Sequence, residues 1–166
     1  GKPVVSWRVK RLLTALFLLT LLAACDKPLT VEQQVISTIR EMEARIEAGE
    51  RRAFMEYIAD DFTARDGRMN RDQVRAMVVF QLNRYERLQA QLFPIAVTET
   101  GADTAEASFR ALVTGGPNWI PDSGQVYDFE TAWRRDGDDW MLVSADWDPV
   151  PLDEVIDKLP VPSSDP

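Results

Sequence analysis

The side chains available for acid–base chemistry in this chain are carboxylates and tyrosines, because the sequence contains no histidine. Histidine has the unperturbed pKa nearest neutrality and is the commonest metal ligand. Its absence, with only one cysteine present, excludes serine–histidine and cysteine–histidine nucleophiles and any internal disulfide. A zinc site would consist of carboxylates alone, which is uncommon. We therefore expect neither a metal nor another cofactor, and a domain stabilised by its apolar core.

The single cysteine, Cys25, follows a segment typical of protein export. Residues 2–11 are basic, and Leu12–Ala24 is an apolar run with the length of a signal-peptide core, shorter than the roughly 20 residues of a membrane span. Residues 22–25, Leu-Ala-Ala-Cys, are similar to a bacterial lipobox, at which diacylglycerol is attached to the cysteine sulfur before cleavage in front of it. We expect residues 1–24 to be a cleaved signal peptide and Cys25 to carry acyl chains such as palmitate.

Acylation of Cys25 predicts a protein anchored in the cell envelope, with its domain in the periplasm. Two or more acyl chains give stable attachment to membrane lipid, and a thioether leaves no free thiol to oxidise outside the cytoplasm. Asp26 resembles the signal that keeps lipoproteins of enteric bacteria in the inner membrane, which favours that membrane. Residues 25–30 are then the lipidated cysteine and a tether.

The part of the chain after this leader is strongly acidic. The 166 residues, which fit one domain, carry 19 basic and 27 acidic side chains. Residues 1–25 hold four basic side chains and no acid, so the remainder carries 15 − 27 = −12 charges. Affinity for nucleic acid rests largely on neutralising phosphates, so we expect no nucleic-acid binding. The charge keeps a domain soluble and favours basic partners over acidic ones.

Helical spacing dominates the first half of the exported part. The residues at 30–33 predict a capping box that begins a helix, and apolar side chains recur on one face over Val31–Ile46. A second, short helix is expected over about residues 51–58. A further capping box at 70–73 predicts a third helix with an apolar face that ends at Tyr85.

Residues 59–67 are expected to leave the second helix and turn at Gly67. The apolar period then changes from helical to alternating, and Leu88–Thr100 predicts a long strand. Its apolar positions shift from even-numbered residues to the odd-numbered Phe93, Ile95 and Val97. Beside Pro94, such a shift is typical of a bulge that bends the strand.

Three more alternating segments predict strands that complete an antiparallel meander, over residues 105–113, 127–133 and 140–147. Three helices followed by this meander predict an α+β fold, with three N-terminal helices packed on a strongly curved, mainly antiparallel sheet. The domain is expected to cover residues 31–147, followed by a tail at 148–166 that is rich in proline and acid.

This order of elements resembles the nuclear transport factor 2-like (NTF2-like) superfamily. The resemblance covers roughly Val31 to Trp147 and rests on order and spacing, on Ile-Ala-Asp-Asp-Phe at 58–62, and on a tryptophan after a glycine turn at 136–140. It implies a cone-shaped, cystatin-like domain with an internal pocket. The superfamily includes ketosteroid isomerases, scytalone dehydratase and polyketide cyclases alongside many binding domains without activity, so only the site decides function.

By segment, the resemblance offers Tyr57, Asp61 and Tyr127 as catalytic candidates. An isomerase-type site needs a carboxylate base with a tyrosine and a protonated acid as oxyanion donors, whereas the histidine of the dehydratase type is missing here. Nothing in the spacing shows that the three side chains meet. At the end of a helix, Asp61 more often bonds a nearby backbone amide or faces water.

Alternation places the pocket-lining candidates Tyr127, Phe129 and Trp133 on the concave face of the third strand. There they either line a ligand pocket or fill a solid core. The opposite face of that strand carries charged side chains that are expected to be solvated cross-strand neighbours, namely Asp128, Glu130 and Arg134.

Two functions follow as hypotheses. The first is a membrane-tethered periplasmic module that binds a small molecule or a protein without catalysis, in which Trp119 and Ile120 form a contact surface or lie over the cone mouth. The second is a tethered isomerase- or cyclase-type enzyme that uses a pocket carboxylate and a tyrosine. A sealed core around Tyr127 and Trp133 favours the first, and an open cavity with a desolvated carboxylate favours the second. The resemblance also allows a homodimer.

Overall fold

The computed structural model describes residues 27–85, 88–115, 123–151 and 153–154. The predicted signal peptide, Cys25, Asp26, the loop residues Trp119 and Ile120 and most of the tail lie outside these ranges. Among the helices within the ranges, none combines the length and the apolarity that crossing a membrane requires.

Two capped helices confirm the sequence prediction. In α2 (Val31–Glu47), the Thr30 hydroxyl accepts a hydrogen bond from the Gln33 backbone N–H at 3.2 Å, and the Gln33 side chain accepts one from the Thr30 N–H at 3.0 Å. Asn70 and Gln73 form the same reciprocal pair at the start of α4 (Arg71–Arg84). These bonds satisfy backbone donors that no intrahelical carbonyl can reach, which fixes where each helix begins.

The prediction for residues 51–67 is partly wrong. The short helix α3 covers only Arg51–Met55, and Ile58–Ala64 is a strand, β1, rather than the end of the helix and a turn. The Arg71 guanidinium donates hydrogen bonds to the carbonyls of Met55 and Ile58, which stabilises this change of direction. The strand forms because it pairs in parallel with β6 (Asp139–Val150), the last strand along the chain and therefore distant in sequence.

The six strands form one sheet in the order β2-β1-β6-β5-β4-β3, antiparallel except for the β1–β6 pair. The remaining strands are β2 (Met69–Asn70), β3 (Leu88–Gly101), β4 (Thr104–Gly115), β5 (Ser123–Asp136) and β6 (Asp139–Val150). The predicted α+β class, with helices on a curved and mainly antiparallel sheet, is confirmed.

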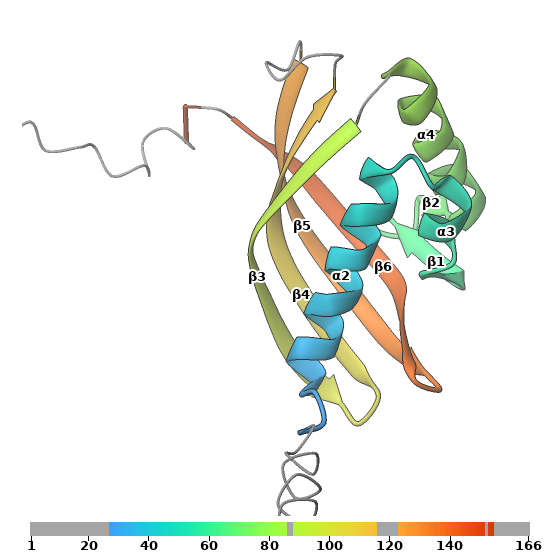
Figure 1. The fold of residues 1–166 in the computed structure, drawn as a ribbon, viewed down its shortest axis with the longest axis vertical. Coiled ribbons are helices and arrows are strands. Elements are labelled where there is room, and N and C mark those ends of the chain that lie inside the picture. The colour runs from blue at the N-terminus through green and yellow to red at the C-terminus, as the bar shows by residue number, and fades with distance from the viewer. Residues whose placement is uncertain (1–26, 86–87, 116–122, 152, 155–166) are drawn as a thin grey trace, which may run out of the picture.

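Two irregularities bend the sheet around α2 (Figure 1). In β3 the register shifts between Phe93 and Ala96, which confirms the predicted bulge, although Phe93 lies 44% exposed and not on the inner face. In β6 the register also shifts, because Ser144 pairs with Ala132 while Leu142 pairs with Trp133. Bulges of this kind increase local twist and curve a sheet.

The core runs along the concave face of the sheet and includes residues of α2, α4, β1, β5 and β6. There α2 lies along the sheet (Figure 1), and Trp133 is 2% exposed. The Trp133 indole N–H donates to the Thr131 hydroxyl at 2.9 Å, and that hydroxyl donates to the Ala107 carbonyl at 2.7 Å. The buried polar atoms of Trp133 and Thr131 are therefore satisfied within the core.

A candidate ligand cavity

Two adjoining cavities lie between the helices and the concave face of the sheet. The outer cavity, about 490 Å³, is bounded by α4, β1 and the neighbouring ends of β4, β5 and β6. The inner cavity, about 210 Å³, lies between α2 and strands β3 to β5. Both are lined by Phe129, Leu142 and Ala145, so they adjoin along the middle of the sheet. Together they are called the ligand cavity below.

Aromatic side chains from three neighbouring strands form one wall of the ligand cavity. Phe109, Phe129 and Trp147 are paired directly across β4, β5 and β6. The Phe109 and Phe129 ring centroids are 5.2 Å apart with 13° between the ring planes, and those of Phe129 and Trp147 are 6.0 Å apart with 30°. All three are only partly buried although they point inward from the sheet, because part of each ring borders empty space.

Few polar groups interrupt this apolar lining. In the outer cavity the polar side chains are Gln81, Gln125 and two tyrosines, Tyr85 and Tyr127. Among the described lining residues of both cavities the one charged side chain is Glu43, which borders the inner cavity, is 16% exposed and pairs with Arg40 at 2.9 Å. A cavity of this composition suits an uncharged ligand oriented by a few hydrogen bonds.

The three catalytic candidates do not come together. Tyr127 lines the outer cavity, and its ring meets the Phe129 ring edge-on at 6.3 Å. Asp61 lies on the outer surface, where its two carboxylate oxygens accept hydrogen bonds from Arg134 at 2.8 and 2.9 Å. The hydrogen bonds from Arg134 lower the pKa of Asp61. A carboxylate that is 65% exposed and held in its charged form is not a desolvated pocket base.

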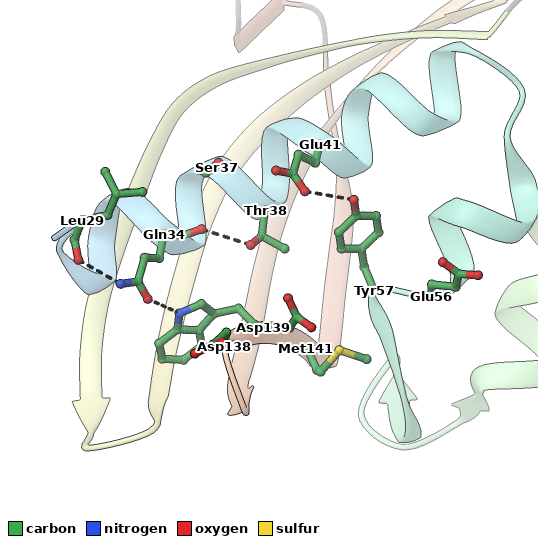
Figure 2. Close-up of a pocket in the computed structure, with 11 residues that line it drawn as sticks. Leu29, Gln34, Ser37, Thr38, Glu41, Glu56, Tyr57, Asp138, Asp139 and Met141 are labelled. Carbon is green, nitrogen blue, oxygen red and sulfur yellow. Dashed lines mark hydrogen bonds between the residues drawn. The ribbon is translucent and has the colours of Figure 1, made fainter. Parts of the chain in front are cut away.

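Tyr57, the third candidate, lies in a separate groove (Figure 2). Its hydroxyl donates a hydrogen bond to Glu41 of α2 at 2.9 Å. Burial raises the pKa of Tyr57, and the bond to Glu41 raises it further by stabilising the protonated phenol. The tyrosine is therefore held as a neutral donor to a carboxylate and has no contact with the ligand cavity.

The groove around Tyr57, about 390 Å³, differs sharply from the ligand cavity (Figure 2). It lies between α2 and the β5–β6 hairpin, where the Trp140 indole N–H donates to Gln34 at 2.9 Å. Its carboxylates come from four positions, Glu41, Glu56, Asp138 and Asp139. Even so, no cluster of three or more potential metal ligands occurs in the described ranges.

The remaining predicted residues have the following positions. Phe129 lines both cavities, and Trp133, which is 2% exposed, lines the inner cavity. On the outer face, Asp128 pairs with Arg110 on β4 at 2.8 and 3.1 Å rather than with Arg134, while Glu130 is exposed. Trp119, Ile120 and Cys25 lie outside the described residues.

Sequence reasoning missed the rim of the outer cavity, where Tyr85 packs on Gly115. A Cβ added to Gly115 would lie 2.4 Å from the Tyr85 ring, so only glycine allows this contact. Met77 and Gln81 of α4 also line this end. Glycine at the end of a strand indicates a close approach by another group, but the sequence does not identify the tyrosine that makes it.

No family model matches this chain, and no curated protein is similar to it in sequence. Solved structures are similar in fold. An NTF2-like protein with a cystatin-like fold from Novosphingobium aromaticivorans has a TM-score of 0.59 at 19% identity, over 87% of this chain and 90% of the other. A proposed dehydratase of the NTF2-like family from Streptomyces avermitilis has a TM-score of 0.60 at 20% identity, over 71% and 95%.

Bd1075 from Bdellovibrio bacteriovorus is also similar, with a TM-score of 0.60 at 13% identity, over 72% of this chain. The match covers 41% of Bd1075, so this chain spans less than half the length of that protein. At such identities the likeness shows the fold: the chain has the NTF2-like, cystatin-like cone. Because one fold supports many activities, function has to be argued from the cavity.

Proposed function

We propose that this NTF2-like domain is a membrane-tethered binding module, which encloses a small apolar molecule in the ligand cavity and does not transform it. The observation that carries the proposal is the inward-facing wall of Phe109, Phe129 and Trp147, whose rings are only partly buried because they border empty space. When a ligand covers apolar surface that borders a cavity, binding is stabilised by about 25 cal/mol for each Å² removed from water.

The polar groups of the outer cavity support binding rather than acid–base catalysis. Gln81, Gln125 and Tyr127 can donate or accept hydrogen bonds. An isomerase- or cyclase-type reaction needs a carboxylate base as well. Asp61 is on the outer surface, paired with Arg134, and therefore does not supply one.

Glu43 is the observation that favours the alternative, a tethered enzyme, because it borders the inner cavity. Its carboxylate pairs with Arg40 at 2.9 Å, as expected of a structural ion pair. The variant Glu43→Gln separates the two functions by turnover, because both predict unchanged binding. An enzyme would lose turnover by a factor of about 100 or more in this variant, whereas a binding module shows no turnover with or without Glu43.

Binding can be tested with Nile red, an uncharged dye that fluoresces in apolar surroundings. We expect saturable binding of one dye per domain. Val113→Trp should abolish it, because Val113 lines both cavities and the larger ring would fill them. Leu112→Trp is the matched control, because the neighbouring side chain on the same strand points to the other face. No saturable binding by the unmodified domain, or equal binding by both variants, would contradict the proposal.

The tether is the second part of the proposal. It rests on the order of basic start, apolar run, Ala23-Ala24 and Cys25, and on the position of α2. Because α2 begins at Val31, only residues 26–30 separate the cysteine from the folded domain. A link this short would hold the domain against the cell-envelope membrane, on the periplasmic side and with the inner membrane favoured by Asp26.

A protein partner that contacts Trp119 and Ile120 should bind the variant Trp119→Ala more weakly than the unmodified domain. Pull-down from membranes with each domain as bait measures this difference.

A further inference from the structure

We propose that the ligand cavity selects flat, uncharged aromatic molecules. The reason is that Phe109, Phe129 and Trp147 form a stack whose ring edges point into the cavity. Arg65 packs on the Trp147 ring at one end of this stack. This inference rests on the proposed binding function and specifies its ligand class.

The stack follows from the register of the sheet. Phe109, Phe129 and Trp147 lie directly opposite one another on adjacent strands, at centroid separations of 5.2 and 6.0 Å and with interplanar angles of 13° and 30°. In this offset stack each ring turns a face toward its neighbour. On the far side of Trp147, the Arg65 guanidinium lies 5.2 Å from the centre of the ring. Because side chains stand roughly perpendicular to a sheet, rings that face one another across the strands turn their edges toward the space above the sheet, which here is the cavity.

Ring edges prefer a particular kind of ligand. The edge of an aromatic ring carries partial positive charge and its face carries partial negative charge, so an edge contacts the face of another ring favourably. A flat aromatic molecule lying across the stack receives several such contacts at once. A flexible alkyl chain of equal size receives only dispersion contacts and loses more conformational entropy when it is enclosed. A cation would be repelled by the partial positive charge of the ring edges. An anion would not be stabilised, because no described lining residue is cationic.

Arg65 is a positioning residue for Trp147. Arg65 and Asp66 both have positive φ angles, 56° and 55°, a conformation that costs free energy for residues other than glycine. Contacts with β6 hold them there. The Arg65 guanidinium donates to the Trp147 carbonyl, the Arg65 N–H donates to the Ala145 carbonyl at 3.2 Å, and the Asp66 N–H donates to the Asp146 carboxylate at 2.8 Å. These bonds fix the backbone that carries Trp147, and the guanidinium covers the outer face of its ring.

Two probes with the same number of non-hydrogen atoms and one hydroxyl each test the selectivity. The probes are 2-naphthol, which is flat and aromatic, and 1-decanol, which is flexible. We expect isothermal titration calorimetry on the folded domain to give a dissociation constant about tenfold lower for 2-naphthol, the factor that a pair of edge-to-face contacts supplies. Equal affinities, or tighter binding of 1-decanol, overturn the selectivity and leave the binding function intact. Binding of neither probe contradicts the binding function itself.

Matched variants identify the residues responsible. Phe129→Leu should remove most of the tenfold preference, because Phe129 is the middle ring of the stack. Phe93→Leu is the same substitution on the outer face, where the ring is 44% exposed, and should leave the preference unchanged. If both variants keep it, the stack does not determine selectivity.

Arg65→Met and Arg65→Lys test the positioning role. The methionine variant removes the cation from the face of Trp147 and should reduce the preference about threefold, whereas lysine retains a cation there and should restore most of it. A purely structural role would lower the thermal midpoint and both affinities together. The ratio of the two affinities is therefore the decisive measurement, and a ratio unchanged in Arg65→Met overturns the role of Arg65.

Discussion

Tyr57 shows how the surroundings of one hydroxyl decide what it can do. In the resemblance to isomerases it is a candidate oxyanion donor, but its proton is committed to Glu41. Burial and this hydrogen bond hold its pKa above the ordinary value of a phenol, so at neutral pH it is a fixed donor in the groove beside α2.

The raised pKa of Tyr57 predicts a loss of stability in alkali. A group whose folded-state pKa is raised contributes stability that is complete below its unfolded pKa, about 10, and is lost as pH rises through the folded value. The difference in unfolding free energy between the unmodified domain and Tyr57→Phe should therefore be constant below pH 10 and shrink above it. Urea unfolding across this range measures it. A difference that grows with pH would show that the sign is wrong.

Asp61 predicts the opposite dependence. Its hydrogen bonds from Arg134 lower its pKa, so its contribution is present above the unfolded value of about 3.9 and is lost as pH falls through the folded value. In urea unfolding, Asp61→Asn should be less stable than the unmodified domain at pH 7, and this difference should shrink as pH falls below about 4. Asp60→Asn is the control, because the neighbouring side chain is exposed and has no hydrogen bond to Arg134.

Gly115 is a residue for which one methyl group should matter. Gly115→Ala pushes a Cβ into the Tyr85 ring, and we expect the domain to lose about 1–3 kcal/mol of stability, as in other overpacked sites. Dye binding should also weaken, because Tyr85 lines the outer cavity. Gly124→Ala is the matched control on the paired strand, where a Cβ would lie 3.5 Å from its nearest neighbour. Similar losses in both variants, measured by urea unfolding, would contradict the packing argument.

At the level of elements, the helix caps should account for much of the local stability of the helices. Asn70→Ala removes the oxygen that accepts the Gln73 N–H and should cost about 1 kcal/mol in urea unfolding. Asn83→Ala, at an exposed position in the same helix, is the control and should change stability by less than about 0.5 kcal/mol. Equal effects of the two substitutions would contradict a specific role for the cap.

These caps also explain why the long helices could be predicted from sequence while β1 could not. A capping box is a contact between residues three positions apart, so its signature is continuous in the chain. The pairing of β1 with β6 joins Thr63 to Ser144, and no local pattern records that contact. The exposed pair Asp60 and Asp61 also interrupts the alternation that identifies a strand.

The candidate site was predictable to a similar degree. Alternation along β5 was enough to place Tyr127 and Phe129 on the inner face. The stack also needs Phe109 and Trp147 to be in register with Phe129, and that register depends on turns and bulges in three strands. The bulge in β3 is visible as a change of parity beside Pro94, whereas the one in β6 carries no glycine or proline.

At the scale of the whole molecule, the proposed anchor makes a direct prediction. Full-length protein expressed in bacteria supplied with radioactive palmitate should be labelled and should sediment with membranes. Cys25→Ser should lose the label and leave the membrane fraction, because the thioether can no longer form. Full-length Phe93→Leu, expressed in parallel, should behave like the unmodified protein. Labelling that persists in Cys25→Ser would disprove acylation at this sulfur.

The direction of α2 has a consequence for how an anchored domain would obtain its ligand. The helix runs from Val31, next to the proposed anchor, along the sheet (Figure 1), and Ile46 near its far end lines the outer cavity. Seventeen residues at about 1.5 Å each make a rod of roughly 25 Å. Anchored at its base, this rod would hold the rim of Tyr85 and Gly115 at the membrane-distal end. A ligand would then arrive through water or from a soluble carrier, and not by sliding sideways out of the bilayer.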